Sequence, residues 1–452
     1  MRDALAARRR GTEAALGALV VIVIVGAYVL VYLAENPALP RDLGGLAAAM
    51  LGLFAAAHLA VRRFAPRADP TLLPLAALLN GIGFVMITRL DRDRAAADAL
   101  GPAQAVWTAV GIAAFVVVLV VVRDIRGLAR YRYTFLLLGL AALMLPLVPG
   151  VGQEVYGARL WAKVGPVTFQ PGEAAKVLLV VFFAAYLVEK RELLASGTRR
   201  LGRLHLPDPK HLGPLLVPWL ASILIMVQEK DLGSSLMFFA VFVAMLYIAT
   251  ARSAYLLAGL LLFLGGAVTA YQLFGHVQVR VSTWLDPWPV AQGKGYQLVQ
   301  SLFAFGTGGV AGTGLGLGSP GKIPQVSTDF IFSAIGEELG LVGTVAVVTA
   351  FILLVGSGIR IAVRSERDFP KLLAAGLAIT IGLQAFVIMG GVTRMIPLTG
   401  ITLPFVSYGG SSLVANYVAL ALLLRIADES NRHTRPARGR ARTPAPVPAR
   451  SP

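Results

Sequence analysis

Residues 14–34 read AALGALVVIVIVGAYVLVYLA, and this stretch decides the class of fold. It carries no charged residue, and as a helix it is long enough to cross the ~30 Å hydrocarbon core of a bilayer. Basic residues precede it, as in a signal peptide, but the apolar run is long and no small-residue cleavage site follows it. We therefore expect a retained first membrane span.

The rest of the chain repeats this pattern. The protein has 452 residues, of which 56% are hydrophobic and 14% are charged, whereas about a quarter of the residues in a soluble domain are charged. Apolar blocks of spanning length lie near residues 14–34, 45–61, 71–88, 104–122, 133–149, 173–189, 212–228, 234–250, 253–274, 330–356, 372–392 and 405–426. The pattern predicts an all-α fold, a polytopic membrane helix bundle of about twelve transmembrane helices.

The net charge of +17 follows this topology. With the N terminus placed in the cytoplasm, 29 of the 41 Lys and Arg residues fall in the termini and in alternate connections. The positive-inside rule therefore predicts that both termini are cytoplasmic. The basic residues form no aromatic-interleaved groove, so we expect no nucleic-acid partner. The chain has no cysteine, which excludes disulfides and thiolate metal sites.

Two long loops, at about residues 149–171 and 275–329, are predicted on the external side, and loops of the second length are usually functional or disordered. The stretch GYQLVQSLFAFG (295–306) places Leu298, Leu302 and Phe303 on one helical face, which predicts an amphipathic helix at the membrane interface. The tail, residues 428–452, is rich in Pro and Arg, and we expect it to be disordered. It would act as a solvated topology anchor or touch anionic membrane lipids.

Ionisable side chains at the ends of spans are costly in lipid, so each is a candidate for function. Glu173 and Lys176 open the sixth span at a spacing that permits an ion pair, and the alternative is that Lys176 faces a cavity and binds an anion. The spacing leaves both interpretations open. Glu229, Lys230 and Asp231 interrupt two apolar runs, which favours a tight turn over a re-entrant element that lines a cavity.

Asp329 ends the second long loop. Ser327, Thr328 or Asp329 would suit the cap of the helix that follows. Glu337 and Glu338 come about two turns later, and carboxylates at this depth need cationic partners. The external basic residues available are Arg159, Lys163, Arg280, Lys294, Lys322 and Arg394.

The segment GVTRMIPLTGITLPFVSYGGSS (391–412) contains too many Pro and Gly residues for a regular helix throughout. Irregular backbone at membrane depth is tolerated where protein or a water-filled cavity surrounds it. A structured hairpin and one wall of a polar cavity are both compatible with this composition.

Five stretches resemble motifs of the SEDS proteins (shape, elongation, division and sporulation), the RodA/FtsW-type cell-wall polymerases. They are WAKVGPVTFQPGEAAK (161–176), QEKDLGSSL (228–236), GYQLVQSLFAFGTGGVAGTGLGLGS (295–319), STDFIFSAIGEELGLVG (327–343) and IPLTGITLPFVSYGGSS (396–412). The resemblance covers about residues 70–427 and is closer to RodA than to FtsW. It implies that residues 1–70 hold a cytoplasmic N terminus and two additional spans, and that residues 71–427 form the family's ten-helix core.

The resemblance further implies a peptidoglycan glycosyltransferase of the bacterial cytoplasmic membrane. Such an enzyme polymerises lipid II into β-1,4-linked glycan strands for cell elongation or division, with a class B penicillin-binding protein as partner. Asp329 resembles the family's essential loop aspartate, Trp161 its loop tryptophan and Lys176 its helix lysine. Lys230 and Ser327 depart from the family's usual Pro and His, and Gly172 departs from its usual Ser, but no residue assigned to chemistry is lost.

An inverting transfer would need a base for the acceptor hydroxyl, assigned to Asp329, and cations for the leaving diphosphate. The expected substrate-binding residues are Trp161, Lys176, Arg159, Lys163, Arg280, Glu173, Ser407, Gly409 and Gly410. A divalent cation, Mg²⁺ or Mn²⁺, would assist, although the sequence shows no metal ligand set. The alternatives are a lipid II flippase and a non-catalytic scaffold; the gathering of polar residues at the external side favours the polymerase.

Overall fold

The computed structural model describes residues 2–34, 37–40, 43–155, 158–165, 167–195, 199–201, 204–206 and 209–433. Ten helices in this part of the chain are long and apolar enough to cross a membrane. They are α1 (Arg2–Leu33), α2 (Leu43–Phe64), α3 (Leu72–Leu90), α4 (Gly101–Val121), α7 (Pro171–Glu189), α10 (Leu232–Thr250), α11 (Ser253–Leu273), α14 (Ile331–Arg364), α15 (Asp368–Val392) and α16 (Gly410–His433).

Two shorter apolar helices, α6 (Arg132–Met144) and α9 (Pro209–Gln228), lie at two further blocks predicted as spans. The all-α membrane bundle is confirmed, and the protein is a multi-pass membrane protein. The short helices are α5 (Arg126–Arg130), α8 (Arg191–Ala195), α12 (Gly275–Leu285) and α13 (Tyr296–Gly308).

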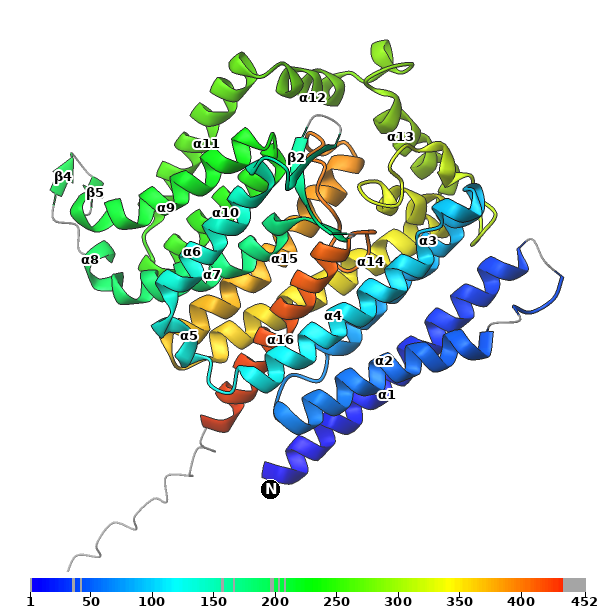
Figure 1. Cartoon of the computed structure of the whole chain (residues 1–452), viewed down its shortest axis with the longest axis horizontal. Coiled ribbons are helices and arrows are strands. Elements are labelled where there is room, and N and C mark those ends of the chain that lie inside the picture. The colour runs from blue at the N-terminus through cyan, green and yellow to red at the C-terminus, as the bar shows by residue number, and fades with distance from the viewer. Residues whose placement is uncertain are drawn as a thin grey trace, which may run out of the picture.

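The centre of the bundle is formed by α7, α14, α15 and α16, with α3 and α4 packed beside them (Figure 1). After Lys176, α7 is apolar around its circumference up to Glu189, which is typical of a helix enclosed on all sides. Its Phe182 and Phe183 are fully buried. In contrast, α11 is apolar and almost wholly exposed, so it meets lipid or another apolar partner along most of its length.

The first long loop folds into a small antiparallel sheet that the sequence analysis did not predict. β1 (Gly152–Val155), β2 (Ala158–Val164) and β3 (Val167–Phe169) pair in this order, with Lys163 opposite Thr168. A two-stranded ribbon, β4 (Arg199–Leu201) and β5 (Leu204–Leu206), follows α8. Figure 1 shows the three-stranded sheet, α12 and α13 at one end of the bundle, and the N terminus and the end of α16 at the other.

The predicted helix in the second long loop is confirmed as α13, but the expected apolar face is wrong. Leu298 is buried, whereas Phe303 is 53% exposed and lies beside Trp288 with the ring centroids 6.0 Å apart. The buried face is instead formed by Leu298, Val299 and Ala304. α12, which was not predicted, precedes it.

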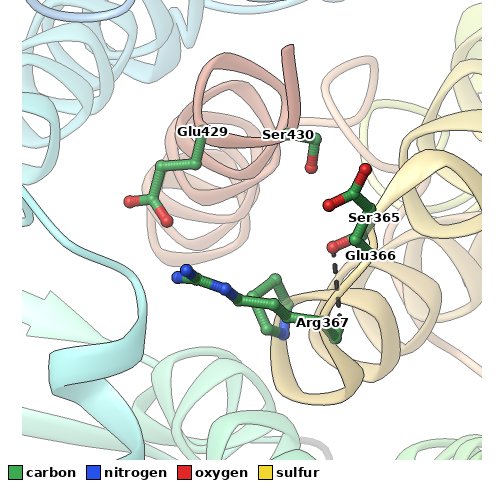
Figure 2. A pocket seen from close by; sticks show the side chains of 6 residues that line it. Ser365, Glu366, Arg367, Glu429 and Ser430 are labelled. Carbon is green, nitrogen blue, oxygen red and sulfur yellow. Dashed lines mark hydrogen bonds between the residues drawn. The ribbon is translucent and has the colours of Figure 1, made fainter. Parts of the chain in front are cut away.

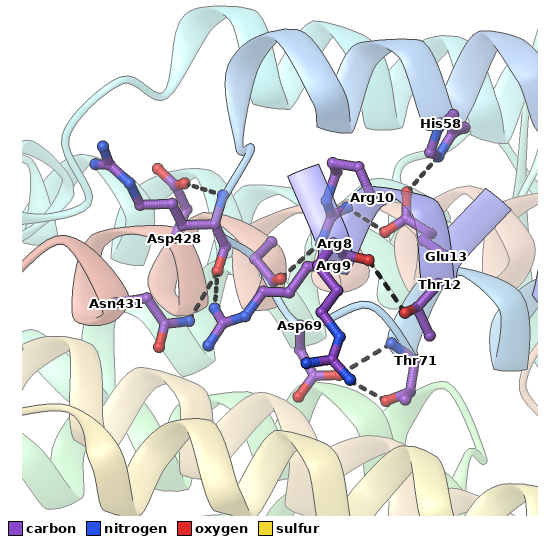
Figure 3. A network of polar contacts seen from close by, with 12 residues as sticks. Arg8, Arg9, Arg10, Thr12, Glu13, His58, Asp69, Thr71, Asp428 and Asn431 are labelled. Atoms are coloured by element: carbon purple, nitrogen blue, oxygen red, sulfur yellow. Dashed lines mark hydrogen bonds and ion pairs between the residues drawn. The ribbon is translucent and has the colours of Figure 1, made fainter. Parts of the chain in front are cut away.

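The additional N-terminal helices α1 and α2 form a hairpin against α3 and α4. Figure 3 shows the polar network at one end of this hairpin. Buried Arg10 pairs with buried Glu13 and donates to the carbonyl of Ala68 at 2.7 Å, and His58 Nδ1 lies 2.7 Å from the second oxygen of Glu13. These bonds compensate the charges that the hairpin buries.

The expected boundary between core and tail at residue 427 is wrong. α16 continues to His433 because its last turns pack on the connection between α2 and α3. Buried Asp428 accepts from the backbone N–H of Arg67 at 2.8 Å, and Asn431 donates to the carbonyl of Arg67 at 2.8 Å. The remainder of the predicted tail, 434–452, lies outside the described residues.

One glycine contact tests this packing. A β-carbon on Gly83 in α3 would lie 2.2 Å from the carbonyl oxygen of Val406, and backbone at that position cannot yield as a side chain does. We expect Gly83→Ala to lower stability by about 1–3 kcal/mol, measured as a lower Tm in detergent. Gly26→Ala in α1 is the control, because its β-carbon meets no described atom within 4 Å. Equal Tm values for the two variants would contradict the prediction.

Candidate active site

Asp329 lies one residue before the N-cap of α14, in a tight turn. The backbone N–H groups of Thr328 and Asp329 donate to the carbonyl of Gln325 at 3.1 and 3.2 Å, and Gln325 has a φ of 56°. α14 begins after Phe330, with no side-chain hydrogen bond at the cap position. Asp329 is therefore not the helix cap, and the alternative that its carboxylate serves only local structure is not supported.

Arg280 of α12 lies close to Asp329, across residue Gly400. A β-carbon on Gly400 would be 3.7 Å from Nη2 of Arg280 and 3.7 Å from Oδ2 of Asp329. Apart from the chain neighbours of Gly400, no other heavy atom of the described residues lies within 4 Å of that point. Gly400 has a φ of 75° and is exposed. A carboxylate and a guanidinium thus flank one open position beside Gly400.

The turn between α9 and α10 holds two buried carboxylates, Glu229 and Asp231, of which Asp231 acts on this pair. Asp231 caps α10, accepting from the backbone N–H of Ser234 at 2.9 Å. Asp231 and Asp329 both act electrostatically on Arg280. The predicted tight turn is confirmed, with Lys230 at a φ of 63°. Both acidic residues of the turn are buried, and Asp231 also acts on Arg280.

Burial changes the protonation of all three carboxyl groups. It raises the pKa of Asp329 to about 6, while the nearby Arg280 opposes the rise. Burial likewise raises the pKa of Asp231, and burial together with Asp231 raises that of Glu229 to about 8. An acid with a pKa near the working pH suits a group that accepts and releases a proton.

Lys176 and Glu173 form the predicted ion pair, with Nζ 2.8 Å from Oε1. Both are buried, and Lys176 also donates to Oε1 of Gln384 at 3.1 Å. They line a cavity of ≈ 20 Å³ between α7, α15 and α16, which is about one water molecule in size. Both sequence interpretations therefore hold in part: the pair exists and a cavity adjoins it, but the cavity is too small for a diphosphate.

Lys176 instead acts on the irregular segment before α16. Gln384, its partner, donates from Nε2 to the carbonyl of Thr402 at 2.9 Å, and Thr402 donates to Ser412 Oγ at 2.9 Å. The buried lysine thus orients an amide that holds the 393–409 backbone. Contact between Lys176 or Glu173 and substrate stays a prediction.

Three predicted substrate-binding residues, Ser407, Gly409 and Gly410, lie in this segment and have structural partners. The hydroxyl of Ser407 donates to the carbonyl of Thr328 and accepts from the N–H of Leu403 at 2.9 Å. Gly410 packs so closely on the indole of Trp107 that a β-carbon would be 2.1 Å from the ring. A β-carbon on Gly409 would lie 3.3 Å from Cγ2 of Thr402. The Ser407 bond positions the Asp329 loop, the two glycine contacts pack the start of α16, and direct substrate contact stays a prediction for all three.

The other predicted residues lie on β2. Trp161 is half-buried and pairs with Gln153 of β1. Arg159 is exposed, forms an ion pair with Glu154 at 3.3 Å, and its backbone N–H donates to the carbonyl of Glu229 at 3.2 Å. Lys163 is exposed at the far end of the strand. The sheet therefore touches the α9–α10 turn that holds Asp231.

Glu337 and Glu338 of α14 are bound by partners other than the external basic residues named from the sequence. Arg89 of α3 pairs with Glu338 at 2.8 Å and donates to the carbonyl of Gly318 at 2.8 Å. Glu338 accepts from the N–H of Gly316 at 2.9 Å, and Glu337 from that of Ser319 at 2.8 Å. The two glutamates fold the glycine-rich loop back onto α14.

Asp231 and Arg89 were not assigned to the site from sequence. Asp231 stands between two apolar runs, and the tight turn favoured there gave it a structural explanation. Arg89 lies one residue beyond the predicted span 71–88 and in the last turn of α3, and a charge at the end of a span is a signal that could have drawn attention to it. Its partner is 249 positions away, which local patterns do not reveal.

In the described residues no group of three or more His, Asp or Glu side chains is arranged to hold a metal ion. The side chains near Asp329 include a guanidinium, which disfavours a cation at the same place. These residues do not fit a protein-held metal site, and the expected Mg²⁺ or Mn²⁺ stays a prediction.

A larger polar cavity of ≈ 170 Å³ lies at the other end of the bundle (Figure 2). Ser365, Glu366, Arg367 and Pro370 line it from the turn between α14 and α15, and Glu429 and Ser430 from α16. Because α14 has 34 residues between this turn and Asp329, the two sites are about 50 Å apart along the helix. This cavity is not part of the candidate active site.

Comparisons with known proteins agree with this arrangement. A family model of cell cycle proteins, named for FtsW, RodA and SpoVE, matches residues 70–432. The chain is 47% identical to the peptidoglycan glycosyltransferase RodA of Mycobacterium tuberculosis over 98% of this chain and 94% of that one. It is 36% identical to the probable peptidoglycan glycosyltransferase FtsW of Nitrosococcus halophilus over 80% and 92%.

Two solved structures are also similar. One is described as structural coordination of polymerization and crosslinking by a peptidoglycan synthase complex, with a TM-score of 0.64 and 28% identity over 80% of this chain and 98% of that one. The other is a mutant of the rod shape determining protein RodA of Thermus thermophilus, with a TM-score of 0.55 and 26% identity over 80% and 97%.

The charges around Asp329 can be tested by moving its pKa in both directions. We expect Arg280→Met to raise the pKa of Asp329 above about 6 because it removes the cation, and Asp231→Asn to lower it because it removes a like charge. Infrared difference titration of the carboxyl band, with Asp329→Asn as the blank, measures both shifts. Shifts of the same sign in the two variants would refute the arrangement.

Proposed function

Since the chain belongs to the family of FtsW, RodA and SpoVE and is RodA-like, we propose that it polymerises lipid II with Asp329 as the general base and Arg280 as a cation for the leaving diphosphate. Its class, peptidoglycan glycosyltransferase, is that of the named relatives at 46–47% identity over nearly the whole chain. The observation that carries the assignment of roles is the open point that Asp329 and Arg280 flank beside Gly400.

The proposed step is a substitution at the donor sugar. The acceptor 4-hydroxyl attacks C1 of the donor, and its proton passes to the carboxylate of Asp329. The bond between C1 and the diphosphate oxygen breaks, and undecaprenyl diphosphate leaves with the electron pair. Because attack and departure occur on opposite faces of C1, an α-linked donor gives a β-1,4 link. The proton and the leaving group therefore need an anionic and a cationic partner, which Asp329 and Arg280 supply.

The protonation of Asp329 fits this role. With a pKa of about 6, the carboxyl group is mostly ionised at neutral pH and is a stronger base than an exposed aspartate. Arg280 donates from Nη1 to the carbonyl of Thr399 at 3.1 Å, which leaves Nη2 directed toward the open point. A divalent ion that assists the reaction would arrive with the diphosphate as part of the substrate.

We place the Asp329 end of the bundle on the external face. The basic connections after α2, α4 and α14 gather at the opposite end, where Arg425 bonds the carbonyl of Phe64 and Glu429 accepts from the N–H of Ile125. This segregation favours a cytoplasmic position for that end and for both termini. Apolar surfaces such as that of α11 would accommodate the lipid tail.

A class B penicillin-binding protein is the proposed partner, and cell elongation the proposed role. The similarity to a structure that couples polymerization and crosslinking supports the first. The higher identity to relatives named RodA than to those named FtsW supports the second.

The test is polymerisation by the purified complex with a transpeptidase-inactive partner. Lipid II is supplied in detergent, and glycan strands are separated by length. We expect Asp329→Asn to reduce the rate about 10²–10⁴-fold, as expected for loss of a general base. The wild-type rate should rise with pH through about 6, because only the ionised Asp329 accepts a proton.

Asp286→Asn is the matched control, since Asp286 is an exposed carboxylate of the same loop. It should keep the wild-type rate. Absence of polymer from the intact complex would refute the polymerase proposal, and lipid II transfer across vesicles without polymer would favour the flippase. Polymer at the wild-type rate from Asp329→Asn would refute the base assignment alone.

A further inference from the structure

Arg94 connects the end of α3 to the loop that carries Asp329. It follows the short 3-10 helix η1 (Asp91–Asp93), which continues α3. Its Nη2 donates to Oγ of Ser327 at 3.0 Å. Ser327 is 3% exposed and stands two residues before Asp329. The two residues are 233 positions apart in sequence, and their contact joins the end of α3 to the Asp329 loop.

The position of Arg94 is itself fixed. Its Nη1 lies 3.2 Å from Oδ1 of Asp91. The carboxylate of Asp91 also accepts from the backbone N–H groups of Leu100 at 2.8 Å and Gly101 at 2.6 Å, at the start of α4. One carboxylate therefore holds both the start of α4 and the guanidinium, and Arg94 is a rigid support for Ser327.

The Asp329 loop has other supports, and they bind its backbone. The N–H of Tyr408 donates to the carbonyl of Ser327 at 2.8 Å, and Ser407 donates to the carbonyl of Thr328. If Arg94 is removed, these bonds remain, so the loop stays folded. Only the side chain of Ser327 loses its donor, and the loop gains freedom to shift on that side.

We propose that Arg94 is a positioning residue for the transfer reaction, and that through Ser327 it fixes Asp329 in its half-buried position near Arg280 and Asp231. This inference rests on the proposed function of Asp329 as the base. Arg94 acts through Ser327, as a support of the reactive carboxylate.

The consequence is measurable in the pH dependence. The groups that face Asp329 are Arg280 from α12, Asp231 from the α9–α10 turn and the hydroxyl of Thr328 from its own loop. Burial is the main cause of its raised pKa, so a loop that shifts and admits water lowers that pKa toward the ordinary value of about 4. The ascending limb of the rate profile then moves to lower pH, and kcat falls because the carboxylate is displaced.

The experiment uses the complex with its partner and lipid II. We expect Arg94→Met and Ser327→Ala each to lower kcat about tenfold, with little change in KM, and to move the ascending limb down in pH. Since both variants break the same bond, the double variant should be about as slow as either single one. Ser327→Thr keeps the hydroxyl that accepts from Arg94. It should therefore keep the wild-type rate and the wild-type position of the ascending limb of the pH profile. Lys322→Met, which removes an exposed cation of the same loop, should behave as wild type.

Each outcome decides the question. Multiplicative losses in the double variant, or slow variants with an unmoved ascending limb, would show that the bond does not position Asp329. Thermal unfolding of every variant identifies a loss that comes from folding. If Asp329→Asn is inactive while Arg94→Met matches wild type, the positioning role fails and the base assignment stands. If Asp329→Asn is fully active, the base assignment fails first.

Discussion

Irregular backbone at the edge of the membrane has to find its hydrogen bonds inside the protein, and residues 393–409 impose this requirement on the whole site. Their carbonyls and N–H groups are met by side chains from several helices. Gln384 binds the carbonyl of Thr402, Arg280 that of Thr399, and Ser407 the N–H of Leu403. The same segment carries Gly400 beside the reactive pair. The residues that satisfy this backbone are therefore also the ones that place the reactive groups.

This requirement explains why charged residues in the site have structural partners. Lys176 forms an ion pair with Glu173 and orients Gln384, and through Gln384 it helps to hold the 393–409 segment. A buried charge without these partners would be destabilising by several kcal/mol. Near Asp329 the balance is different, because Arg280 faces two carboxylates, Asp231 and Asp329. Burial is the main cause of the raised pKa of Asp329; Arg280 opposes the rise and Asp231 adds to it. A raised proton affinity is what a base at neutral pH requires.

Local patterns in the sequence predicted the helices, because a span is defined by its own composition. Asp329 was singled out by the resemblance of its motif to the SEDS proteins, since local pattern alone favoured a helix cap. Local patterns did not predict the Arg89–Glu338 pair or the proximity of Arg280 to Asp231, because these partners are far apart in sequence and no periodicity links them. The strands of the first loop were missed since they are short and lack clear alternation of apolar and polar residues.

The two sides of the reactive pair are anchored unequally. Asp329 lies directly before α14 in a loop that is bonded to Arg94 and Ser407, whereas Arg280 belongs to α12, where Thr283 is buried and the other residues are half-buried or exposed. α12 is held to the 393–409 segment by Arg280 and by Trp284, whose indole donates to the carbonyl of Arg394 at 3.1 Å. Arg394 donates in return to the carbonyls of Trp284 and Leu285, the last of the helix. A cation at this helix end offsets its negative dipole. Arg394 therefore ties the end of α12, the helix that carries Arg280, to the segment that carries Gly400.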